Sequence, residues 1–330
     1  MPTKHHAAGN LPGLREVWAA RKRISAYVQE TPLFLSAELS KRYNASVYLK
    51  LEYLHPTGSF KLRGAANKIL SLSKAERSRG VATFSTGNHG LAVAYMAKEL
   101  GIPVSVFLSS RVPGAKVNNL EALGINVVVH GVSQDEAQEY CLQRAAEEGL
   151  TVIMPFDDPA VLAGQGTIGL ELLERCPDLD HVIVPVSGGG LAGGIAMALK
   201  AGVPGIRVTG VSMEQGAVMY HSVRAGKPVI LEEADSLADS LLGGIGLDNK
   251  YSFPLVRDFV DEIVLVPEKA IARGMSLLYQ RHRIVVEGAS ATCVAALDQT
   301  AVAPGSSVAL ILSGNNVDTG TFFDIVNSNV

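Results

Sequence analysis

The chain has 330 residues, of which 47% are hydrophobic and 18% charged, and its formal net charge is -3. This length and composition predict an ordinary globular protein with a sizeable core, built as two domains or as one large α/β unit. The near-neutral charge argues against nucleic acid or an anionic membrane surface as a partner.

The N-terminal stretch and the cysteines predict a cytoplasmic protein. Residues 1–10 lack the apolar core of a signal peptide, and no apolar run nears the ~18 residues that span a bilayer. Cys141, Cys176 and Cys293 stand far apart without a CxxC pair. We therefore expect no disulfide framework and no structural zinc site, and interpret the cysteines as small buried hydrophobic residues.

From residue 46 onward, short β-branched runs alternate with longer helical stretches. Strands are predicted at 46–52, 81–85, 103–109, 126–131, 181–186, 207–212, 262–267 and 307–313. Helices are predicted at 90–101, 115–124, 133–149 and 190–202. Several of the strands are apolar on both faces, as parallel strands covered by helices are. The alternation therefore predicts an α/β fold with open sheets and right-handed crossovers.

The strand–helix units fall into two clusters, which predict two domains. Residues 53–150 form the smaller cluster, and residues 1–52 together with 151–330 form the larger one. The sequence PFDDP at 155–159 is a plausible crossover between them. Because ligands of open α/β sheets bind beyond the carboxyl ends of the strands, the loops that follow the strands are the candidate functional segments.

The first of these segments is TGSFKLRGA, residues 57–65, which places Lys61 between Phe60 and Leu62 at the start of a helix. Burial and a helix N-terminus both disfavour an ammonium group and lower the pKa of a lysine. A lysine with a lowered pKa can act as a nucleophile. The structural alternative is a lysine on the surface of a helix.

The second segment is the glycine-rich turn in PVSGGGLAGG, residues 185–194. Backbone N–H groups without side chains in the way, at a helix N-terminus, can converge on a phosphate. The candidate phosphate cradle is Ser187, Gly188, Gly189, Gly190 and Leu191. A tight strand-to-helix turn is the structural alternative.

The same glycines support a rival function. Gly188, Gly190 and Gly193 satisfy GxGxxG, and Glu214 follows at roughly the distance of the acid that binds ribose in a dinucleotide fold. Taken alone, this spacing favours an NAD-dependent oxidoreductase.

Two further segments follow predicted strands. STGNHG, residues 85–90, opens a helix with small and amide side chains, which suits a carboxylate; an ordinary helix cap is its alternative. LSGNNVD, residues 312–318, offers the Ser313 hydroxyl, or is a simple Asx/Gly turn.

Together the four segments supply a lysine for a Schiff base, a phosphate cradle, an amide for a phenolate oxygen, a hydroxyl for a ring nitrogen and a helix start for a carboxylate. Pyridoxal phosphate (PLP) bound to an amino acid needs all five.

The sequence also resembles a known family. GSFKLRGA, STGNHG, GQGTIGLELLE, SGGGLAGG and SGNNVD, in this order along nearly the whole chain, are similar to the fold-type II PLP enzymes of the threonine dehydratase and serine racemase group. The resemblance implies two open twisted-sheet domains like those of the tryptophan synthase β-subunit. The larger domain would bind the cofactor, the smaller one would gate the substrate, and the protein would be a homodimer.

The resemblance also implies roles for individual residues. Lys61 would bind PLP covalently and move the α-proton. The phosphate would be bound by Gly188, Gly189, Gly190 and Leu191, beside Ser187. Asn88 would contact the 3′ oxygen and Ser313 the ring nitrogen. Phe60 and Glu287 would lie near the ring. Substrate contacts would come from Ser85, Thr86, Asn88, His89, Ser240 and Gly243. For Glu287 the alternative is an acid that stabilises a helix N-terminus.

The implied activity is β-elimination of a hydroxy amino acid such as threonine or serine, giving a keto acid and ammonia. Thr86, where racemases of the group have serine, leaves a racemase as the alternative. Glu214 matches the first acid of a divalent-cation site, but Val218 and Tyr220 follow at the other positions, so no metal is expected. The loop 238–256 resembles dehydratase-like proteins of hydroxyectoine use. A binding protein without catalysis is a third alternative, against which the intact Lys61 argues.

Overall fold

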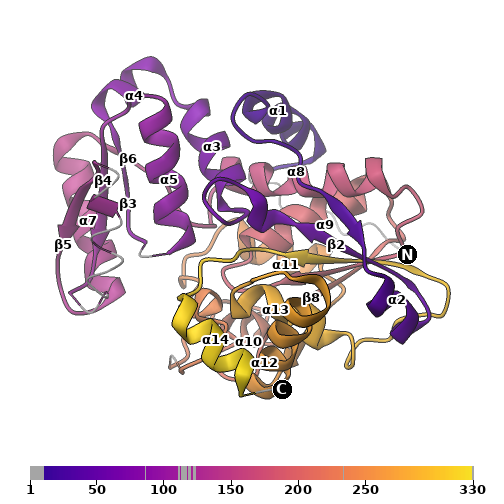
Figure 1. Ribbon diagram of the computed structural model, residues 1–330. Coiled ribbons are helices and arrows are strands. Elements are labelled where there is room, and N and C mark those ends of the chain that lie inside the picture. Colours follow the sequence, from indigo (N-terminus) through magenta and orange to yellow (C-terminus); the bar gives the residue numbers. More distant parts are fainter. Residues whose placement is uncertain are drawn as a thin grey trace.

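The computed structural model describes residues 11–85, 87–110, 112, 117, 120–121, 124–232 and 234–328. Two open sheets, one of six strands and one of four, organise the chain (Figure 1). Their strand orders are β1-β2-β10-β7-β8-β9 and β5-β4-β3-β6. The predicted α/β fold with two open sheets is confirmed.

The larger sheet is parallel except for its edge strand β1, which runs antiparallel to β2. Its strands are β1 (Leu33–Leu35), β2 (Ser46–Leu51), β7 (His181–Pro185), β8 (Arg207–Met213), β9 (Glu262–Val266) and β10 (Ser307–Leu312). Strand β10 lies in the interior of the sheet, where Val308 pairs with Val47 of β2 and His181 of β7. Such strands are apolar on both faces because helices cover both sides of the sheet.

One face of this sheet is covered by α8 (Pro159–Arg175) and α9 (Gly190–Gly202), which pack on each other. Helix α1 (Leu14–Ile24) packs on α8, and α11 (Ser252–Phe259) packs on α9. The other face is covered by α13 (Gly288–Ala296), with α12 (Glu268–Leu277) and α14 (Thr319–Asn327) outside it (Figure 1). Shorter elements complete this part: α2 (Ala37–Tyr43), α10 (Val218–Ala225), the 3₁₀ turns η1 (Glu52–Leu54) and η2 (Asp239–Leu241), and the π-helical turn η3 (Leu278–His282).

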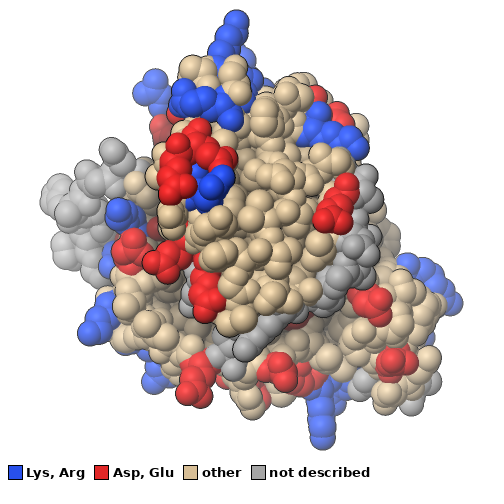
Figure 2. All heavy atoms as spheres, turned by 90° about the vertical axis from the view of Figure 1, so that its left-hand side faces the viewer, with Lys and Arg blue, Asp and Glu red and all other residues tan. Residues whose placement is uncertain are grey.

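The smaller sheet is parallel throughout. It consists of β3 (Val81–Thr83), β4 (Val104–Leu108), β5 (Asn126–Val129) and β6 (Thr151–Val152), with α4 (Lys74–Arg79), α5 (Asn88–Glu99) and α7 (Gln134–Glu148) around it. Helix α3 (Lys61–Ser71) packs against both α5 of this part and α8 of the larger part. It therefore joins the two sheets. On the outer side of the smaller part, basic and acidic side chains are interspersed around a broad uncharged area (Figure 2).

All eight predicted strands are present, with ends that differ by one or two residues. The short strands β1 and β6 were not predicted, because two or three residues are too few for a period of two to be recognised. The helix predicted at 115–124 lies largely outside the described residues. The domain boundaries stay a prediction; the pairing of β6 with β3 favours placing the second boundary after Val152.

Among the described residues, no helix has both the length and the apolar character needed to cross a membrane.

Candidate active site

The candidate segments meet beyond the carboxyl ends of strands from both sheets. Helices α3, α5, α9 and α13 begin at Lys61, Asn88, Gly190 and Gly288. The segment before α3 is fixed to the loop after β10, because the Phe60 N–H donates to the Ser313 carbonyl at 3.0 Å. Four helix N-termini with free N–H groups thus open on one region, which suits an anionic ligand.

Lys61 is the first residue of α3 and is partly buried. Its Nζ donates to the Pro155 carbonyl at 2.8 Å and lies 5.2 Å from the centre of the Phe60 ring. Burial lowers the pKa of Lys61 to about 8, although the negative charge of Glu287 acts in the opposite direction. An internal partner and a lowered pKa do not fit a lysine on the surface of a helix.

The residues after Lys61 fix the position of its helix. Arg63 is fully buried, and its guanidinium donates to Glu52 at 2.7 and 2.9 Å and to Glu171 at 2.5 and 2.8 Å. Lys50 also donates to Glu171 at 2.6 Å. This buried network ties α3 to β2, η1 and α8, and no sequence motif predicts it. Because its charges are paired and hydrogen-bonded, it holds the N-terminus of α3 in one place.

The glycine-rich turn has little room for side chains. A Cβ atom added at Gly188 would lie 2.4 Å from Cδ1 of Phe156, and one at Gly190 would lie 2.9 Å from Cβ of Phe156. Gly189 is the N-cap of α9 and has a φ of +83°, a conformation that favours glycine. These glycines thus bring bare backbone to the start of α9, where the first N–H groups have no partner within the helix.

The residues beside the glycines and the acid after the next strand differ in exposure. Ser187 is partly buried and Leu191 is buried in the first turn of α9. Glu214, the candidate ribose acid and candidate metal ligand, is exposed just beyond β8. Within the described part of the chain, no group of three or more His, Cys, Asp or Glu side chains could hold a metal ion.

Asn88 and Glu287 are in direct contact, although 199 residues separate them. The Asn88 Nδ2 donates to both carboxylate oxygens of Glu287, at 2.9 and 3.1 Å. The Ser240 hydroxyl donates to the same carboxylate at 2.9 Å, and the Asn316 backbone N–H donates to it at 3.2 Å. Asn316, which the sequence analysis did not single out, also donates through its side chain to the Asn88 Oδ1 at 2.5 Å.

Ser313 lies 3.2 Å from the hydroxyl of Ser290, a residue that the sequence analysis missed. Ser290 is held by Gly314, donating to its carbonyl and accepting from its N–H, both at 2.7 Å. The Ser313 hydroxyl has the 3.2 Å contact with Ser290, which is long for a hydrogen bond between hydroxyl groups. Its hydrogen can therefore turn towards the ring nitrogen of a bound ligand. A serine inside the helix 288–296 carries no motif that would mark it.

The remaining predicted residues surround the start of α5. The His89 Nε2 donates to the Ile153 carbonyl at 2.9 Å, so its Nδ1 is an acceptor. Burial, and next the charge of Lys61, lower the pKa of His89 to about 3, which keeps the ring neutral. Ser85 is partly buried, and Gly243 has a φ of +105° in the loop that carries Ser240. Thr86 lies outside the described residues.

Three buried polar atoms of these segments have no hydrogen-bond partner: Oγ1 of Thr57, Oγ of Ser59 and Nδ1 of His89. Such atoms are costly unless a ligand or water satisfies them. Together with the lysine, the bare helix start at the glycine turn and the Ser313 hydroxyl, they form a donor and acceptor set that fits PLP.

A family model described as "Pyridoxal-phosphate dependent enzyme" matches residues 24–314. The chain belongs to this family. The PLP enzymes similar to it include L-threonine ammonia-lyase of Thermotoga maritima, which is 39% identical over 314 residues, covering 95% of this chain and 78% of that protein. Serine racemase of Oryza sativa subsp. indica is 35% identical over 326 residues, covering 97% of this chain and 94% of that protein. The structure of maize serine racemase matches with a TM-score of 0.90 at 33% identity, covering 97% of this chain and 98% of that one.

The resemblance to the threonine dehydratase and serine racemase group of PLP enzymes is thus confirmed, and so is PLP as the cofactor. This decides against the nicotinamide function that Gly188, Gly190, Gly193 and Glu214 favoured on spacing alone. The link to hydroxyectoine use stays a prediction.

Proposed function

We propose that this chain is a PLP-dependent ammonia-lyase that removes the β-hydroxyl group of a hydroxy amino acid such as threonine or serine. The products are a keto acid and ammonia. The observation that carries the proposal is Lys61, a partly buried amine with a pKa of about 8 at the start of α3. The relatives include an L-threonine ammonia-lyase, 78% of which is covered by the match with this chain.

The residues that would hold the cofactor come from all the candidate segments. Lys61 would bind it covalently, beside the Phe60 ring. The backbone N–H groups of Gly188, Gly189, Gly190 and Leu191 at the start of α9, next to Ser187, would hold its phosphate. Asn88 would donate to its 3′ oxygen and Ser313 to its ring nitrogen. When bound, PLP supplies an electron sink for the pair released at the α-carbon of the substrate.

The substrate carboxylate would lie at the N-terminus of α5. The N-cap residue of this helix, Gly87, contributes no side-chain hydrogen bond, so the first backbone N–H groups stay available. The resemblance adds Ser85, Thr86, Asn88 and His89 to this site, with Ser240 and Gly243 on the facing loop. Because the side chains of Asn88 and His89 have other partners, these two residues would contribute their backbone N–H groups. A helix N-terminus stabilises an anion without placing a second lysine or arginine near Lys61.

Lys61 would act as the base once the amino group of the substrate has displaced it from the cofactor. A pKa of about 8 leaves roughly a tenth of its amine neutral at pH 7, whereas an ordinary lysine is almost entirely protonated. The neutral amine takes the α-proton, and the hydroxyl group leaves as water with a proton from a nearby donor. The resemblance assigns to Thr86 the hydroxyl group that would return the proton from the other face of the substrate in a racemase.

The racemase alternative rests on the similarity to the rice and maize serine racemases. One assay separates the two activities. The purified enzyme is incubated with L-serine and L-threonine, keto acid and ammonia are measured, and the D-amino acid is quantified by chiral chromatography. The proposal predicts equal amounts of keto acid and ammonia with little D-isomer; D-serine without keto acid would overturn it in favour of racemisation.

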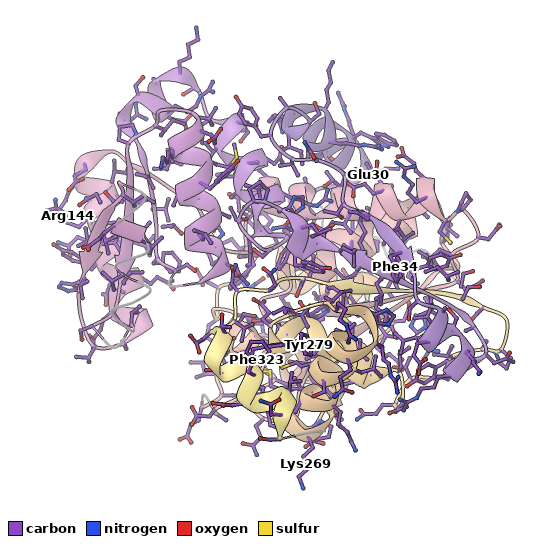
Figure 3. All side chains as sticks on the ribbon, viewed as in Figure 1. Glu30, Phe34, Arg144, Lys269, Tyr279 and Phe323 are labelled. Atoms are coloured by element: carbon purple, nitrogen blue, oxygen red, sulfur yellow. The ribbon has the colours of Figure 1, made fainter. Side chains whose placement is uncertain are left out.

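We also propose a homodimer in the cytoplasm. Phe34 on the edge strand β1 is 47% exposed and lies against His282, while Phe323 on α14 is 41% exposed and lies against Tyr279 (Figure 3). Exposed aromatic residues of this kind are enriched in interfaces, here with a second copy of the chain. The three cysteines are free and buried, which suits a reducing compartment.

A further inference from the structure

Glu287 is a buried carboxylate whose position does not follow from helix capping. It is the N-cap residue of α13, but its side chain makes no cap hydrogen bond to that helix. It is 3% exposed and accepts hydrogen bonds from Asn88, Ser240 and the backbone of Asn316 instead. The interpretation of Glu287 as an acid that stabilises its own helix start therefore does not explain where the carboxylate points.

The contacts of Glu287 fix the orientation of the Asn88 amide. A carboxylate only accepts hydrogen bonds, so the Nδ2 of Asn88 must face Glu287. On its other side, Asn88 presents Oδ1 to the donating amide of Asn316. The two hydrogens of an amide nitrogen point about 120° apart, so a single carboxylate binds one of them. The second N–H of Asn88 is left for another acceptor.

We propose that Glu287 is a positioning residue, which turns the Asn88 amide so that one N–H faces an acceptor oxygen of the cofactor and which sets negative charge beside Lys61. This inference rests on the proposed function, because the acceptor is the phenolate oxygen of PLP. Without Glu287, the contact with Asn316 alone would hold the Asn88 amide. A rotated amide would present its oxygen to the phenolate, which would be repulsive.

The charge of Glu287 has a separate, measurable effect. It favours the protonated form of Lys61 and so raises the pKa of that lysine, against the larger effect of burial. Burial raises the pKa of Glu287, and the charge of Asp239 on η2 acts in the same direction, whereas the hydrogen bonds from Asn88, Ser240 and Asn316 oppose this rise. His89 on α5 also faces Lys61, whose charge helps to keep the His89 ring neutral. Removing the Glu287 charge should therefore lower the pKa of Lys61 further below about 8.

The test compares Glu287→Gln with the matched control Glu268→Gln. Glu268 accepts from Ser236 and from the Leu237 backbone, on the same loop as Ser240, but has no contact with Asn88 or Lys61. PLP is removed, and its Kd for each apoenzyme is measured by fluorescence. We expect Glu287→Gln to weaken PLP binding about tenfold or more, as the loss of a buried hydrogen bond to a charged group does, and Glu268→Gln to leave it unchanged.

A second measurement separates positioning from simple loosening of the site. The rate at which Lys61 of the apoenzyme reacts with an acylating reagent is followed against pH by peptide mass spectrometry. In Glu287→Gln, the pH at which the acylation rate of Lys61 is half-maximal should be lower than in the wild type. If the substitution merely opened the site to water, the midpoint would move up towards that of an exposed lysine.

The dependence on Asn88 is tested in a double-variant cycle. If Glu287 acts through Asn88, Glu287→Gln should have almost no effect on the Kd of PLP in an Asn88→Ala background. An unchanged Kd in the single variant, the same loss in both backgrounds, or a midpoint that stays or rises would each overturn the inference. Failure of the wild-type apoenzyme to bind PLP at all would instead overturn the proposed function, and with it the role of Asn88.

Discussion

The side-chain amine of Lys61 is bound to the backbone carbonyl of Pro155 at 2.8 Å, across 94 residues of sequence. Pro155 lies just before Phe156, whose ring packs on the glycine turn, and Asp157, which accepts from three backbone N–H groups at the start of α11. The segment 155–157 therefore links the nucleophile, the candidate phosphate cradle and the larger sheet. This contact holds the amine of Lys61 in a defined place before a cofactor binds.

The first prediction concerns the pH dependence of Lys61. Its folded pKa of about 8 is below its ordinary value because burial penalises the charge. In the apoenzyme, covalent reaction with PLP should thus rise with pH and level off above about pH 8. The same group makes folding more favourable as the pH rises from about 8 towards the ordinary lysine pKa, since the unfolded chain binds more protons there. Stopped-flow absorbance across pH checks the rate; a midpoint near pH 10 would contradict the burial argument.

The second prediction concerns the packing of Phe156 on the glycine turn. Gly188→Ala would place a Cβ atom 2.4 Å from the Phe156 ring. We expect a loss of about 1–3 kcal/mol of stability, as overpacking causes, together with weaker PLP binding. Urea denaturation gives the first quantity and fluorescence titration the second.

Two further variants complete this test. Gly205→Ala is the control, because no atom lies within 4 Å of the added Cβ. The combination of Gly188→Ala with Phe156→Leu should recover part of the lost stability, because the smaller side chain makes room. An equal loss of stability in Gly188→Ala and Gly205→Ala would argue against a steric clash with Phe156 as the cause.

The third prediction concerns the buried network around Arg63. Arg63→Met leaves Glu52 and Glu171 buried with fewer partners, which typically costs about 3–5 kcal/mol. Arg175→Met is a suitable comparison, because Arg175 pairs with Glu30 at the surface with 64% of its side chain exposed. Surface pairs contribute about 0–1 kcal/mol. Denaturant titration gives the free energy of unfolding of both variants. Similar small decreases in this free energy for Arg63→Met and Arg175→Met would exclude a stabilising role of the network.

These residues illustrate what the sequence could and could not predict. The strands and the segments around Lys61, Asn88, Gly188 and Ser313 were predictable, because each combines a strand pattern with an adjacent polar or glycine-rich loop. The partners of these residues were not. Their contacts join positions far apart in the sequence, as between Glu287 and Asn88, and no local period or motif encodes such a contact.

The buried charges show the same limit more clearly. Lys50 lies in a strand and Glu171 in a helix, where a charged residue is normally assigned to the solvent-facing side. Only the fold shows that both are buried, because their partners come from other elements. Ser290 was missed for a related reason: its hydrogen bonds go to a loop 24 residues further along the chain.

The fourth prediction concerns the proposed homodimer. Phe34→Lys adds a charge to an exposed aromatic residue on β1 and should shift the protein towards the monomer. Leu142→Lys, on α7 of the smaller part, is the control, since Leu142 is similarly exposed at 44%. Light scattering coupled to size-exclusion chromatography gives the mass of each variant. A wild-type mass equal to that of one chain would rule out the dimer.

The most direct test of the account is to identify which lysine binds PLP. The purified holoenzyme is reduced with borohydride, digested and analysed by peptide mass spectrometry, with Lys61→Ala treated in parallel. We predict a PLP adduct on Lys61 in the wild type, no adduct in the folded variant, and loss of keto acid formation in that variant. An adduct on another lysine, or near-normal turnover by Lys61→Ala, would contradict the central role of Lys61.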